Sequence, residues 1–238
     1  MHDQRLDRLS ESQHALIARR QMRGLGYSNS AVSRAWSRSP VWEAVTPEVA
    51  RRVGAPRTTG QRLLAAVLDA GGDATVEGLC AMRWWGHRGC SLEPIRLVTT
   101  SSSSHRTELA VTRRVRRLEP TWTTMLDGVP TVRPELLAMQ LFDVCSYGRA
   151  ERLTEWLWSE RVLSGPSIHV FLERAGARGR NGTAGLREYL ATRPADYVPA
   201  ASGLEARAMQ LFAEAGLPMR RQVDSGAESW TGRVDFRH

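Results

Sequence analysis

The chain has 238 residues, of which 42% are hydrophobic and 24% charged, a balance that excludes a disordered chain. It contains no apolar run long enough to cross a membrane and no signal-peptide-like segment near its start, so we expect a cytoplasmic protein without a membrane partner. The formal net charge is +8 and every basic residue is Arg, a side chain suited to binding phosphate, so DNA is the favoured polyanionic partner.

Residues 1–57 predict a small basic unit of short helices followed by a hairpin. The second helix is expected in LIARRQMRGLG and the third in YSNSAVSRAWSRS, with Ser28 as its N-terminal cap. In the third helix, Val32, Ala35 and Trp36 share one face at helical spacing. The run VWEAVTPEVARRV then predicts a hairpin, and this order of elements is typical of a winged helix-turn-helix.

The opposite face of the third helix is polar. Its candidate DNA-contacting residues are Asn29, Ser30, Ser33, Arg34 and Arg38. These side chains can hydrogen-bond to phosphates or to base edges in the major groove, so we expect a DNA-binding surface here. The alternative interpretation is a solvated polar face on a small helical unit, and both interpretations stay open at this point.

Residues 58–165 predict a mixed α/β middle unit. TTGQRLLAAVLDAGG predicts a helix capped by Thr59, and ATVEGLCAMRWWG predicts another. EPIRLVTT and HRTELAVTRRV predict strands, and TTMLDGVPTVR predicts a hairpin that turns at Asp127-Gly128. Helices are expected again in PELLAMQLFDVCSYG and AERLTEWLWSERVLS.

Several residues of this unit have both a structural and a functional interpretation. Four Trp residues could stack on bases, but aromatic side chains at helical spacing more often belong to the core. These residues are Trp84, Trp85, Trp156 and Trp158. The densest basic cluster consists of Arg113, Arg114, Arg116 and Arg117. It is either a phosphate-binding patch or a solvated strand edge. His87 between Cys80 and Cys90 suggests zinc, but a fourth ligand is missing, so small buried thiols are favoured.

Residues 166–201 predict a helical linker, and residues 202–238 predict a helix followed by two short strands. The strands are expected in MRRQV and GRVDF, and Asp235 lies in the second. Glu205, near the start of the helix, is expected to face the sheet, although SGLE also fits a capping box.

The run GLEARAMQLFAEAGLP followed by GRVDF resembles the opening of the very-short-patch-repair-like branch of the PD-(D/E)XK nuclease superfamily. The resemblance implies the start of a restriction-endonuclease-like α/β domain. It also implies that Glu205 and Asp235 are catalytic carboxylates that bind Mg2+, which would activate water for phosphodiester hydrolysis. The acidic residue of the next strand in that family is missing here, so we expect a truncated domain that does not cleave DNA.

The upstream part resembles actinobacterial AbiEi antitoxin-like proteins. The segments that carry this resemblance are LIARRQMRGLGYSNSAVSRA, LLAAVLDAGGDATVEGLCAMRWWG, DGVPTVRP and GRNGTAGLREYL. It implies a winged helix, an antitoxin-like middle domain and a toxin protein as a partner. One departure affects the wing, because Glu48-Val49-Ala50 stands where the family often has Gly-Val-Tyr.

We therefore expect an α+β chain with four parts. They are a winged helix-turn-helix (1–57), a middle domain (58–165), a helical linker (166–201) and an incomplete nuclease-like domain (202–238). The favoured function is that of a DNA-binding protein of the antitoxin or transcription-regulator type. The alternatives are an Mg2+-dependent DNA endonuclease in a longer form of the protein, and a protein-interaction module that neutralises a toxin.

Overall fold

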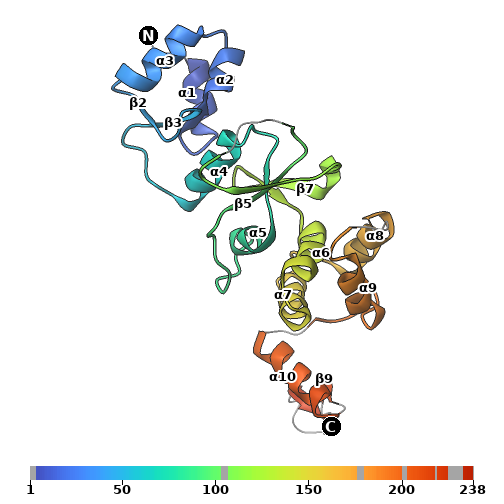
Figure 1. The fold of residues 1–238 in the computed structure, drawn as a ribbon. Helices are drawn as coiled ribbons and strands as arrows, with labels where there is room; N and C mark the ends of the chain where they lie inside the picture. Colours follow the sequence, from blue (N-terminus) through green and yellow to red (C-terminus); the bar gives the residue numbers. More distant parts are fainter. Residues whose placement is uncertain are drawn as a thin grey trace. The chain divides into compact units, whose positions relative to one another are not determined.

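The computed structural model describes residues 4–102, 107–175, 180–199, 203–217, 219–224 and 233–237, and for 203–206, 220–224 and 233–237 it describes the backbone (Figure 1). The fold is α+β, as predicted. The chain divides into two compact units, residues 1–133 and 134–238. This division falls within the predicted middle domain. Within the described residues, no helix is long and apolar enough to cross a membrane.

The first unit begins with three short helices on one face of a three-stranded antiparallel sheet. Its elements are α1 (Gln4–Glu11), β1 (Leu16–Ala18), α2 (Arg19–Gly24), α3 (Asn29–Arg38), β2 (Trp42–Ala44) and β3 (Val49–Arg52). The strands pair in the order β1-β3-β2, which confirms the predicted hairpin. Because side chains alternate across a sheet, Ile17, Trp42 and Ala50 face the helices and form a core with them.

The prediction of one continuous helix over LIARRQMRGLG was wrong at its start. Leu16–Ala18 forms β1, which pairs with β3 and is completely buried. Helix α2 then begins directly after Ala18, whose backbone N–H donates to Oε1 of Gln21 at 2.9 Å. Strand pairing with a distant segment therefore overrides the local helical pattern of this run.

The rest of the first unit is a five-stranded mixed sheet with two helices. Its elements are α4 (Thr59–Asp69), β4 (Thr75–Val76), α5 (Gly78–Trp84), β5 (Arg96–Thr99), β6 (Val111–Arg114), a 3-10 turn (Pro120–Trp122), β7 (Thr123–Leu126) and β8 (Val129–Val132). The strand order is β6-β5-β4-β8-β7. The predicted hairpin at Asp127-Gly128 is confirmed, and both residues have the positive φ that its turn requires.

Two sequence predictions for this part need correction. The helix predicted over ATVEGLCAMRWWG begins only at Gly78, because Thr75–Val76 forms β4 in the centre of the sheet. The cap of α4 is Thr58, not Thr59, and its side chain accepts a hydrogen bond from the N–H of Gln61 at 3.1 Å. Helix α4 is buried along nearly its whole length, because it packs against both the three-stranded and the five-stranded sheet.

The second unit is mainly helical. It contains α6 (Pro134–Val144), α7 (Tyr147–Ser159), α8 (Gly165–Ala175), α9 (Thr183–Ala191), α10 (Gly203–Glu214) and the antiparallel pair β9 (Arg220–Asp224) and β10 (Arg233–Arg237). Helix α9 packs closely on α6 at Gly182, where φ is +78°. A Cβ at Gly182 would lie 1.9 Å from the carbonyl oxygen of Met139, so only glycine fits there.

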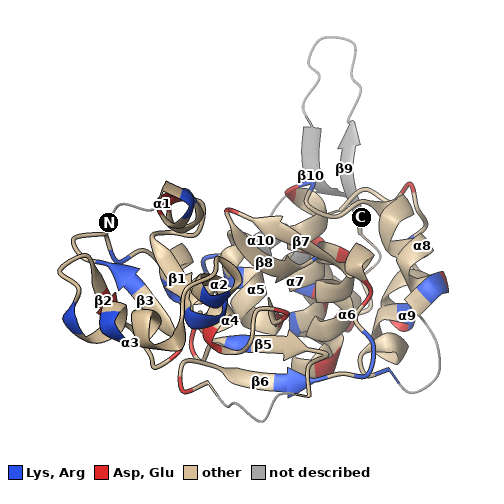
Figure 2. Cartoon of the chain, turned by 90° about the horizontal axis from the view of Figure 1, so that it is seen from above, with Lys and Arg blue, Asp and Glu red and all other residues tan. Residues whose placement is uncertain are grey.

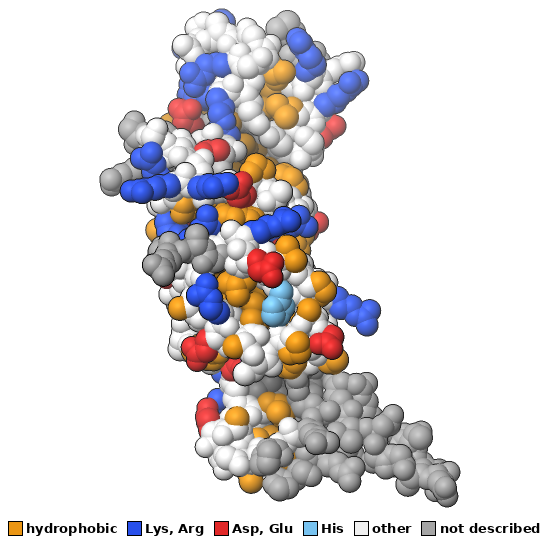
Figure 3. Space-filling view, turned by 90° about the vertical axis from the view of Figure 1, so that its right-hand side faces the viewer, with side chains coloured by type: hydrophobic (Ala, Val, Ile, Leu, Met, Phe, Trp, Pro, Cys, Tyr) orange, Lys and Arg blue, Asp and Glu red, His pale blue; other side chains and the backbone are white. Residues whose placement is uncertain are grey.

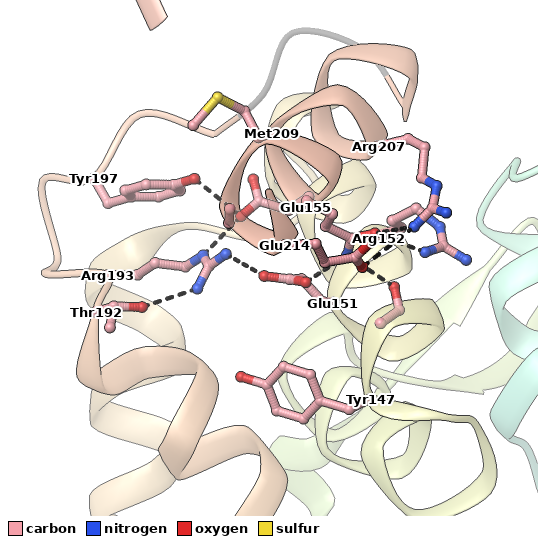
Figure 4. A pocket seen from close by; sticks show the side chains of 13 residues that line it. Tyr147, Glu151, Arg152, Glu155, Thr192, Arg193, Tyr197, Arg207, Met209 and Glu214 are labelled. Atoms are coloured by element: carbon pink, nitrogen blue, oxygen red, sulfur yellow. Dashed lines mark hydrogen bonds and ion pairs between the residues drawn. The ribbon is translucent and has the colours of Figure 1, made fainter. Parts of the chain in front are cut away.

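A partly buried ionic network attaches the predicted linker to α7 (Figure 4). Glu155 accepts hydrogen bonds from Tyr189 at 3.0 Å, from Arg193 at 2.8 Å and from Tyr197 at 3.1 Å. Arg193 also pairs with Glu151 at 2.5 Å, and its guanidinium lies 4.1 Å from the ring centroid of Tyr189. Burial, together with the charge of Glu155, raises the pKa of Tyr189 above its usual range, so the hydroxyl stays protonated and donates.

Loss of the Glu155 carboxylate should destabilise the second unit. Because Glu155→Ala removes a buried carboxylate and leaves the partly buried Arg193 without one of its two carboxylate partners, we expect the free energy of unfolding to fall by about 3 kcal/mol. Urea denaturation followed by Trp fluorescence measures this change. The matched control is Glu173→Ala, which removes an exposed carboxylate from α8 and should cost less than about 0.5 kcal/mol. Equal losses in the two variants would contradict the structural role of Glu155.

The free cysteines should differ in reactivity. Burial raises the pKa of Cys80 on α5 to about 11, and it also raises the pKa of the more accessible Cys145. Since the thiolate is the reactive form, we expect iodoacetamide to alkylate Cys145 well before Cys80 in the folded protein. Mass spectrometry over time measures the order, and alkylation in denaturant, where all three cysteines should react, is the control. Equal native rates for Cys80 and Cys145 would show that the α5 site opens readily.

Candidate nucleic-acid interface

The start of α3 is defined by a short turn after α2. Gly26 adopts a φ of +95°, and the N–H of Tyr27 donates back to the carbonyl of Met22 at 3.1 Å. Ser28 then caps α3, because its hydroxyl accepts a hydrogen bond from the N–H of Ala31 at 3.2 Å. The predicted cap is confirmed, and the compact turn sets the direction in which α3 leaves α2.

Packing determines which face of α3 meets solvent. Val32 and Trp36 are buried in the core that α3 shares with α1 and the three-stranded sheet, and Ala35 is partly buried against it. The polar face is accessible, and the structure places all of the predicted DNA-contacting side chains there as exposed residues: Asn29, Ser30, Ser33, Arg34 and Arg38. The helical spacing in the sequence therefore separated the two faces of α3 correctly.

The charges around α3 leave both of its arginines available. Among the described residues, neither Arg34 nor Arg38 forms an ion pair. Arg19 lies beside the helix, where it donates to the hydroxyl of Ser33 at 3.3 Å and stacks 5.2 Å from the ring centroid of Trp36. Figure 2 shows further basic positions on α2 and β3, and on the face drawn in Figure 3, Arg side chains are interspersed with acidic and hydrophobic residues.

The turn between β2 and β3 is held against the rest of the first unit. The hydroxyl of Thr46 donates to Oδ1 of Asp69, at the end of α4, at 2.6 Å. The guanidinium of Arg19 donates to the carbonyl of Pro47, and Glu48 lies 3.9 Å from Arg23. The turn therefore contains an acidic side chain and is attached at its tip, so it is not a free basic arm.

The two predicted catalytic residues are placed by their elements only. Glu205 belongs to α10, and Asp235 belongs to β10, which pairs with β9. Their side chains lie outside the described part of the structure. Elsewhere in the described residues, no three His, Cys, Asp or Glu side chains are grouped so that they could hold a metal ion.

Two other groups singled out in the sequence take structural roles. The indole N–H of Trp84 donates to the carbonyl of Leu126, and that of Trp85 to the carbonyl of Val132, each at 3.1 Å. Arg113, on the exposed edge strand β6, forms a two-point ion pair with the buried carboxylate of Glu77 at 3.0 and 2.6 Å. These contacts favour the structural interpretation of the two Trp residues and of Arg113.

Comparison with known proteins does not extend this description. No protein-family model matches the chain, and a search of curated proteins finds no match.

The sequence patterns did not indicate Arg19 as part of the α3 surface. It lies at the junction of β1 and α2, and it reaches Ser33 only because the sheet and α3 pack together. The one feature of the sequence that could have indicated this contact is the position of Arg19 directly after three apolar residues. Because that run was interpreted as helix, the feature was not recognised.

Removal of the α3 cap should destabilise the helix that carries this surface. We expect Ser28→Ala to lower the free energy of unfolding by about 1 kcal/mol, because the N–H of Ala31 loses its acceptor. Denaturant titration of the whole chain measures the loss. Ser37→Ala, which removes an exposed hydroxyl from the last turn of α3, is the matched control and should have a smaller effect. A loss for Ser37→Ala as large as that for Ser28→Ala would argue against the cap.

Proposed function

We propose that the chain binds double-stranded DNA through α3, in the manner of a winged helix-turn-helix protein of the antitoxin or transcription-regulator type. The order α1-β1-α2-α3-β2-β3, with the sheet order β1-β3-β2, supports this assignment. In such proteins the helix after the short turn enters the major groove, and α3 occupies that position.

The observation that carries the proposal is the composition of the exposed face of α3. Arg34 and Arg38 lie one helical turn apart, and both are exposed and free of ion pairs with other described residues. Their guanidinium groups can therefore bind phosphates or guanine edges without first breaking an internal ion pair. Asn29 and Ser30, at the start of the same helix, can donate to phosphate oxygens or to bases.

The β2–β3 turn is poorly suited to contact DNA, and this restricts the proposed interface. Thr46 is bonded to Asp69, and Glu48 would repel a phosphate. We therefore assign DNA contact to α3 and its neighbours and not to the turn. The proposed interface therefore differs from that of a winged helix whose wing also contacts DNA. The difference coincides with Glu48-Val49-Ala50, the point at which the sequence departs from the family pattern.

Loss of both α3 arginines should weaken DNA binding and reduce its salt dependence. We expect Arg34→Ala/Arg38→Ala to lower the affinity by about tenfold or more at low salt. The slope of log affinity against log salt concentration should fall by about 0.9 for each lost phosphate contact. Fluorescence anisotropy with a labelled duplex of mixed sequence, over a salt series, measures both quantities.

The matched control is Arg149→Ala, which removes an exposed arginine from α7 and should leave the affinity and the salt slope unchanged. The proposal fails if the wild-type chain does not bind duplex DNA at low salt. It also fails if the α3 double variant and the Arg149 variant bind as the wild type does.

A second proposal concerns a longer form of the protein. The order of α10, β9 and β10, with Asp235 on β10, agrees with the start of the nuclease-like domain that the sequence resemblance implies. Mg2+-dependent cleavage by Glu205 and Asp235 stays a proposal for a chain that also carries the next acidic strand. Neutralisation of a toxin by contact likewise stays a proposal, and none of the described surfaces specifically favours it.

A further inference from the structure

A cavity of about 570 Å³ lies between the β2–β3 hairpin and the first turns of α4. Glu43 and Arg51 line it from the hairpin, and Thr59 and Arg62 line it from α4. Arg57 and Thr58, from the segment between β3 and α4, and Gln61 from α4 add to the polar lining. Its volume lies within the range of about 300–1,000 Å³ that is typical of small-molecule sites.

The lining of this cavity is basic. It contains Arg51, Arg57 and Arg62, from three different segments, and its one acidic side chain is that of Glu43. Arg51 is fixed by its ion pair with Glu43, and Arg62 is paired with Glu93 outside the lining. Arg57 forms no ion pair with any other described residue, so the cavity keeps an uncompensated positive charge.

The cavity offers more hydrogen-bond donors than acceptors. The Arg51 side chain is only 10% exposed, so its position is set by the surrounding structure. Glu43 accepts from Nε and one terminal nitrogen of Arg51, and Thr58 already accepts from the N–H of Gln61. The exposed side chains of Arg57 and Thr59 add further donors to the lining. An anion with several oxygens, such as a phosphate group, matches this set.

This cavity is separate from the α3 surface. Ala50, which faces α3 and the other N-terminal helices, is next to Arg51 in β3, and the side chains of adjacent strand residues point to opposite faces of the sheet. Glu43 is the register partner of Arg51 and shares its face. The cavity therefore opens on the α4 side of the sheet, away from the face on which α3 packs.

We propose that this cavity binds the phosphate group of a small phosphorylated molecule, held by Arg57 and Arg62 above the fixed Arg51–Glu43 pair. Because the site lies on the opposite face of the sheet from α3, the proposal does not depend on DNA binding by α3. The phosphate of a DNA backbone has the same chemistry, and the experiment below distinguishes the two sources.

Calorimetric titration with inorganic pyrophosphate, at constant ionic strength, tests the site in the full chain. We expect saturable binding, and we expect Arg57→Gln and Arg62→Gln each to weaken it by about tenfold, because each removes a charge-assisted contact. Both side chains are at least partly exposed, so the variants should fold. Arg149→Gln, in the second unit, is the control and should bind pyrophosphate with wild-type affinity.

Absence of saturable binding overturns the proposal, and so does equal binding by the wild type and both cavity variants. Duplex DNA binding by Arg57→Gln then identifies the source of the phosphate. Unchanged DNA affinity, with weakened pyrophosphate binding, supports a small-molecule ligand. Reduced DNA affinity, together with displacement of DNA by pyrophosphate from the wild type, overturns the small-molecule ligand in favour of a backbone contact. Loss of DNA binding in the α3 variants alone leaves the cavity proposal standing.

Discussion

The first unit depends on the burial of α4 between two sheets. A helix that is buried on nearly all sides must be apolar along its length and must have polar partners at its ends. Thr58 satisfies the N-terminal end, and Arg20 donates to the carbonyl of Leu68 near the C-terminal end. Asp69 binds Thr46 and so connects α4 to the β2–β3 turn. The position of the three-stranded sheet, and with it the direction of α3, follows from these contacts.

The second unit combines an apolar helix with a polar network. Helix α6 is largely buried against α7, α8 and α9. The carboxylate of Glu155 on α7 accepts three further hydrogen bonds, from Tyr189, Arg193 and Tyr197. Such a network is costly to bury and is stable only when each member has its partners. It also explains why a Pro-containing stretch with the composition of a linker is attached to α7, since Arg193 and Tyr197 both belong to that stretch.

The sequence predicts those features that depend on neighbouring residues. The α3 face, its Ser28 cap and the Asp127-Gly128 turn follow from helical spacing and from turn chemistry, so all three were found. Strands β1 and β4 were not found, because runs of three and two residues carry no period of their own and form only through distant partners. The cavity was missed for the same reason. Its arginines come from segments that only the tertiary fold brings together.

If α3 binds DNA as proposed, the attachment of the β2–β3 turn limits how much of a DNA sequence one copy of the chain can distinguish. Helix α3 has ten residues, so it is about 15 Å long, and at 3.4 Å per base pair it spans only about four base pairs. A given sequence of four base pairs recurs roughly once in every few hundred positions of a genome, so α3 alone would recognise a frequent site. Recognition of a rare site would require two such sequences to be bound together. The spacing between neighbouring copies of the protein would then contribute to the specificity.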